Sequence, residues 1–66
     1  MPTREQIEQG ILDTLRETPR VSIFWATENQ QRAHAMDRLE SSGRIVRRRD
    51  KESGYPWMVF DVAEEL

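Results

Sequence analysis

The chain has 66 residues, no cysteine and a formal net charge of −2. A chain of this length buries only about 60% of its unfolded surface, so we expect one small domain with little room for an enclosed active site. The lack of cysteine excludes disulfides and thiolate metal sites and agrees with a cytoplasmic location. No apolar run approaches the roughly 18 residues of a membrane span, and the charged N-terminus is not that of a signal peptide. We expect residues 1–66 to form a single domain with frayed ends at 1–3 and 63–66.

A first helix is predicted near the N-terminus. Thr3 and Gln6 have the spacing of a capping box, in which each side chain accepts a hydrogen bond from the other residue's backbone N–H. Pro19 disfavours helical geometry at Thr18, so the helix should end near Glu17. Apolar residues recur between these limits at helical spacing, at Ile7, Ile11, Leu12 and Leu15.

The segment after Pro19 predicts a short strand at Arg20 to Ile23, because Val21 and Ile23 alternate with polar residues. The run from Ile23 to Ala26, which contains Phe24 and Trp25, is the most apolar part of the chain. It suits either a single helical turn or a continued strand, since periodicity cannot distinguish the two over four residues.

A second long helix is predicted from about Glu28 to Ser42. Thr27 and Gln30 repeat the capping-box spacing, and Gly43 is the expected stop just beyond the last turn. One face carries Ala33, Met36 and Leu39. The other, predicted to face solvent, carries Gln31, His34 or Ala35, Arg38 and Ser42.

The C-terminal third predicts a β-hairpin. Its arms are Ile45 to Arg49 and Pro56 to Val62, and the loop between them, DKESGY, is rich in turn residues. Alternation assigns the second arm's residues to two faces. The more apolar face, predicted to pack on the helices, carries Met58, Phe60 and Val62. The outer face carries Trp57, Val59 and Asp61.

Positive charge is concentrated in the middle of the chain. Residues 32–51 contain seven bases and three acids, a net +4, whereas residues 1–31 carry a net −2 and residues 52–66 a net −4. Because local charge neutralises phosphates, the acidic total does not argue against a nucleic-acid partner.

The predicted order, together with the pattern Leu39, Gly43, Ile45 at the helix–strand joint, resembles the winged helix-turn-helix family. The resemblance covers roughly residues 4–62. It implies a small α+β fold in which two main helices pack on a C-terminal β-hairpin, the wing, with a short extra strand near residues 20–23. Family members usually have a full middle helix. Only the ten residues from Val21 to Gln30 are available for it here, so that helix should be a single turn or absent.

The resemblance implies binding of double-stranded DNA, with the helix at about 28–42 in the major groove. Transcription control or DNA processing would be its role. Helix residues that would read bases are Gln30, Gln31, Arg32, His34 and Arg38. Residues that would contact the backbone from the wing segment 44–51 are Arg44, Arg47, Arg48, Arg49 and Lys51. So few phosphate contacts bind weakly, which favours a homodimer or a larger assembly on DNA.

Three alternatives remain open from the sequence. In the first, the arginines form a solvated sheet edge that deters edge-to-edge pairing. Alternation supports this interpretation, because Arg47 and Arg49 point to one side of the strand and Arg48 to the other. In the second, the domain is a protein-interaction module anchored by Trp25 and Trp57. In the third, the partner is RNA, which the sequence does not distinguish from DNA. No enzyme activity, cofactor, metal or small-molecule substrate is expected, because the single histidine lacks ligand or nucleophile partners.

Overall fold

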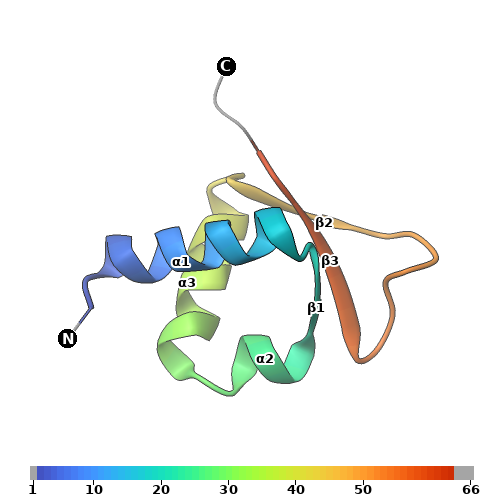
Figure 1. Ribbon diagram of the computed structural model, residues 1–66, viewed down its shortest axis with the longest axis horizontal. Helices are drawn as coiled ribbons and strands as arrows, with labels where there is room; N and C mark the ends of the chain where they lie inside the picture. The colour runs from blue at the N-terminus through green and yellow to red at the C-terminus, as the bar shows by residue number, and fades with distance from the viewer. Residues whose placement is uncertain (1, 64–66) are drawn as a thin grey trace.

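A computed structural model describes residues 2–63 of the chain, which form three helices and a three-stranded antiparallel sheet (Figure 1). The elements, in chain order, are α1 (Arg4–Glu17), β1 (Arg20–Ser22), α2 (Ile23–Thr27), α3 (Gln30–Ser41), β2 (Ile45–Arg48) and β3 (Trp57–Val62). This confirms the predicted α+β class and its winged-helix-like arrangement, with a very short middle helix. Among the described residues, no helix has the length and hydropathy needed to cross a lipid bilayer.

The predicted capping box at the start of α1 is confirmed. Thr3 Oγ1 accepts a hydrogen bond from the Gln6 N–H at 3.1 Å, and Gln6 Oε1 accepts one from the Thr3 N–H at 2.8 Å. Near the other end of the described chain, the Ala63 N–H donates to the Arg44 carbonyl at 2.9 Å. Met1 and residues 64–66 lie outside the described part of the chain.

The predicted cap of the second long helix is wrong. Asn29, in an extended conformation, is the N-cap of α3, and its Oδ1 accepts from the Arg32 N–H at 3.1 Å. Thr27 is instead the last residue of α2, and its hydroxyl donates to the Ile23 carbonyl at 2.8 Å. The apolar run thus forms a helical turn that reaches Thr27. A residue in helical conformation cannot serve as an N-cap, so α3 begins at Gln30.

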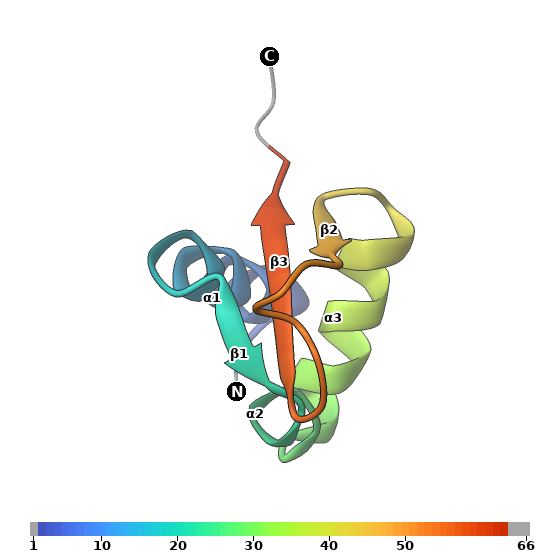
Figure 2. The ribbon, with the colours of Figure 1, turned by 90° about the vertical axis from the view of Figure 1, so that its right-hand side faces the viewer.

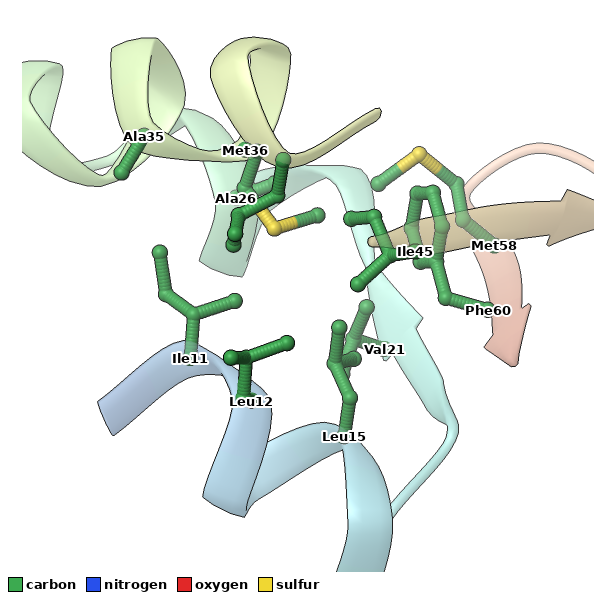
Figure 3. Packing of buried hydrophobic residues seen from close by; sticks show 11 residues of the cluster. Ile11, Leu12, Leu15, Val21, Ala26, Ala35, Met36, Ile45, Met58 and Phe60 are labelled. Atoms are coloured by element: carbon green, nitrogen blue, oxygen red, sulfur yellow. The ribbon is translucent and has the colours of Figure 1, made fainter. Parts of the chain in front are cut away.

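The sheet has the order β1-β3-β2, so the hairpin is joined by the short strand that precedes α2. Its inner face packs on the helices, as predicted for Met58 and Phe60. Figure 3 shows these side chains with Ile11, Leu12 and Leu15 of α1 and Met36 of α3 around one core. Ala35 of α3 is fully buried, so of the two predicted alternatives it is His34 that faces solvent.

The outer face of the sheet is covered, and the sequence does not predict this. Val59 points away from the helices yet is 0% exposed and stands apart from the main core. The register places Arg20 of β1 and Arg48 of β2 on either side of it. The β2–β3 loop also crosses over β3 on this side (Figure 2). The wing loop therefore folds back across the sheet and covers Val59.

Candidate nucleic-acid interface

The exposed side of α3 carries three of the five predicted base readers. Gln30 and His34 are four positions apart, so they are neighbours on the helix surface, and both are exposed. Gln31 is also exposed and lines a groove between α3 and α1. The same helix carries Asp37 and Glu40 one to two turns further along. It therefore presents uncharged polar groups first and carboxylates later.

Arg32 does not face outward. Its guanidinium lies over the Trp25 ring, 4.6 Å from the centroid. Its Nη1 donates to the Trp25 carbonyl at 2.6 Å and to Glu28 Oε1 at 3.0 Å. Trp25 is itself partly buried against the core. The structure therefore joins a predicted base reader and a predicted partner anchor in one intramolecular contact between α3 and α2.

Arg38, predicted to face solvent, is only partly exposed and is held in an ion pair, with its side chain 37% exposed. Its Nε lies 2.9 Å from Glu8 Oε2 on α1. The Arg44 Nη1 lies 3.6 Å from the other carboxylate oxygen of Glu8. Glu8 is only 16% exposed in its side chain, and this one carboxylate joins α1 both to α3 and to the residue that precedes β2. The helix period places Arg38 at the boundary with α1, where Glu8 is within reach.

Arg48 is held by three carboxylates. It lies 3.1 Å from Asp50, 3.6 Å from Asp61 and 4.0 Å from Glu52. It shares the outer face of the sheet with Val59, while Arg47, paired with Phe60, belongs to the inner face at the sheet edge. The alternation predicted for the arginine run is thus confirmed, and it separates two residues that were expected to act together.

Three cations of the wing segment form no ion pair with the described part of the chain. In residues 2–63, the bases for which no ion pair or ring contact is formed are Arg4, Arg47, Arg49 and Lys51. All four are exposed. Arg47 lines a groove between α3 and the sheet that also includes Asp37 and Glu40. Unpaired positive charge is therefore concentrated between residues 47 and 51.

Trp57 is 38% exposed, and one face of its ring is covered by the Arg20 guanidinium at 4.1 Å. Arg20 Nε also donates to the Glu52 carbonyl of the wing loop at 3.3 Å. Neither Arg20 nor Glu8 was singled out from the sequence. Their roles depend on strand register and helix packing, which no local pattern encodes.

The described residues contain no group of three or more metal-ligating side chains placed to hold an ion, and no buried charged side chain. Comparison of the chain with protein-family models, curated proteins and solved structures finds no match. The arguments for function therefore rest on the surface of this molecule.

Proposed function

We propose that this domain binds double-stranded DNA through residues 47–51 of the wing segment and the N-terminal half of α3. The observation that carries the proposal is the uneven distribution of unpaired cations. Within residues 2–63, six of the ten Lys and Arg side chains are held by carboxylates, carbonyls or tryptophan rings. Three of the other four lie in five consecutive positions, at Arg47, Arg49 and Lys51. A phosphate does not have to displace an intramolecular partner there.

The first turns of α3 support the same proposal. The first turn contains no acidic residue, and the positive end of the helix dipole favours a nearby phosphate. Gln30, Gln31 and His34 are hydrogen-bonding groups on this half of the helix, and glutamine can pair with adenine in the major groove. Asp37 and Glu40 would repel the backbone if the whole helix lay in the groove. We therefore expect contact through the N-terminal half alone, which is the half that such helices use to reach bases.

This interface is smaller than the ten residues predicted from the sequence. Contacts from three cations bring modest, salt-sensitive affinity, so we expect tight binding only from a homodimer or a larger assembly. A role in transcription control or as an accessory in DNA processing agrees with such a module. The protein-interaction alternative, anchored by Trp25 and Trp57, is weakened because an arginine covers a face of each ring.

The test is a titration of a labelled mixed-sequence duplex at several salt concentrations, followed by fluorescence anisotropy. The wild-type protein should bind, and log K should fall linearly with log salt. Replacing Arg47, Arg49 and Lys51 together by Gln should reduce the slope by up to about 2.7, or about 0.9 for each phosphate that is no longer neutralised. The proposal is wrong if the wild-type protein, shown to be folded, binds no duplex at low salt.

Arg4→Gln is the matched control for Arg49→Gln. Each change removes one exposed positive charge that has no ion pair in residues 2–63, so each alters the net charge equally. Arg4 begins α1, at the opposite end of the long axis from the wing (Figure 1). Arg49→Gln should lower the salt slope and Arg4→Gln should not. An equal effect of both would mean that only overall charge matters.

A further inference from the structure

Two exposed aromatic rings meet at the junction of α2 and the wing loop. Phe24 of α2 is 58% exposed and Tyr55 of the loop is 83% exposed. Their centroids lie 6.1 Å apart, with the ring planes at 77°. This edge-to-face arrangement is favourable for an aromatic pair, but it leaves most of both rings in water. The sequence separates the two residues widely, so the pair is created only by the fold.

The backbone around this pair is fixed by hydrogen bonds. The Ile23 N–H donates to the Pro56 carbonyl at 2.7 Å. The Gly54 N–H donates to the Trp57 carbonyl at 2.9 Å, so a backbone hydrogen bond links the residue before Tyr55 to the strand that follows it. Ring faces held in place lose little conformational freedom when a ligand binds to them. The pair is therefore carried by a backbone that is held in place on both sides, and the two rings contact each other.

The charge of the same loop favours an anionic partner. Its two acids, Asp50 and Glu52, are both paired with Arg48. Its two bases, Arg49 and Lys51, form no ion pair within residues 2–63. Residues 48–55 carry three bases and two acids, a net +1, and the two charges among them without an ion pair in the described chain are both positive. Exposed aromatic rings beside unpaired cations are the combination that binds nucleic acid with unpaired bases, because rings stack on bases and cations contact phosphates.

We propose that the Phe24–Tyr55 pair stacks on unpaired nucleobases, so that the domain prefers duplex DNA that continues into a single strand. The inference rests on the proposed function for the contact of the wing with the duplex. It adds the class of substrate: a junction between paired and unpaired DNA, with the bases of the single strand against the rings.

The experiment compares a blunt mixed-sequence duplex with the same duplex carrying a single-stranded tail of about six nucleotides. Wild-type protein should bind the tailed DNA about tenfold more tightly, within the range expected for stacking on one base. The double change Phe24→Leu and Tyr55→Leu should abolish this preference and leave blunt-duplex affinity unchanged. Leucine keeps an apolar contact between α2 and the loop but has no flat ring. Tyr55→Phe, which keeps the ring, is the matched control and should retain the preference.

The outcomes separate this inference from the proposed function. Salt-dependent binding to both DNAs with equal affinity overturns the inference alone, and the pair then serves only to fasten the loop to α2. A preference for the tail that survives the double leucine change also overturns it. Binding to the tailed DNA but not to the blunt duplex, abolished by the double change, overturns the proposed function and supports the stacking role. Binding to neither DNA overturns both.

Discussion

Adjacent arginines in this chain differ in what surrounds them. Arg47 lies on the inner face at the sheet edge without an ion pair in the described chain, whereas Arg48 on the outer face meets three carboxylates. The strand's alternation produces this difference. A count of basic residues therefore overstates the charge that a ligand would meet, because an arginine held by acids offers little net charge.

Glu8 is the residue for which pairing should matter most to stability. Its carboxylate accepts a hydrogen bond from Arg38 and lies near Arg44, and its side chain is mostly shielded from water. We therefore expect the Glu8–Arg38 ion pair to be stronger than an exposed ion pair and weaker than a fully buried one. Glu8→Gln should lower the free energy of unfolding by about 1 kcal/mol, since it leaves two cations without their counter-charge. Urea unfolding followed by circular dichroism measures the change.

Glu40→Gln is the control for this change, because Glu40 is an exposed carboxylate of α3 without an ion pair in the described chain. It should alter stability by less than about 0.5 kcal/mol. If Glu8→Gln proved as neutral as Glu40→Gln, the link between α1 and α3 would not depend on this carboxylate.

At the scale of the element, the start of α3 shows how local rules compete. Two residues that can cap a helix lie two positions apart, at Thr27 and Asn29, and the structure uses the second.

Asn29→Ala should destabilise the domain by about 1 kcal/mol, because the Arg32 N–H loses its acceptor. Asn29→Asp should restore most of the stability. Thr27→Ala should change stability by less than about 0.5 kcal/mol, and thermal unfolding of all three variants measures the difference. A larger effect of Thr27→Ala than of Asn29→Ala would contradict the observed cap.

The elements that the sequence predicted well are those with local signals. The Thr3 capping box, the apolar stripe of α1 and the turn-rich wing loop all act over a few residues, so their pattern is visible in the chain. The features that the sequence did not predict depend on strand register and on the packing of elements against each other. Glu8 meets Arg38 only because α1 lies against α3, and Phe24 meets Tyr55 only because the wing loop folds back. Val59 was assigned to the correct face, yet its burial depends on the loop that covers it.

For the molecule as a whole, one small core must hold all the elements together. Without disulfides, and with no metal site among the described residues, the core of a domain of this size rarely supplies more than about 3–5 kcal/mol of net stability. Leu15 of α1 is fully buried beside the sheet and α3. Leu15→Ala should cost about 2–5 kcal/mol through reduced burial and the cavity left behind. Because that cost is comparable with the total, a large fraction of the variant should be unfolded at 25 °C.

Val46→Ala is the matched comparison, because it also removes methyl groups but from an exposed position on β2. It should stay within about 0.5 kcal/mol of the wild type. Urea unfolding of both variants, with the far-ultraviolet circular dichroism in water as a second readout, measures the contrast. If Leu15→Ala kept its full helical signal and a midpoint close to that of Val46→Ala, α1 would not belong to the same cooperative unit. The ion pairs that join α1 to α3 and β2 would then have to be explained without a shared core.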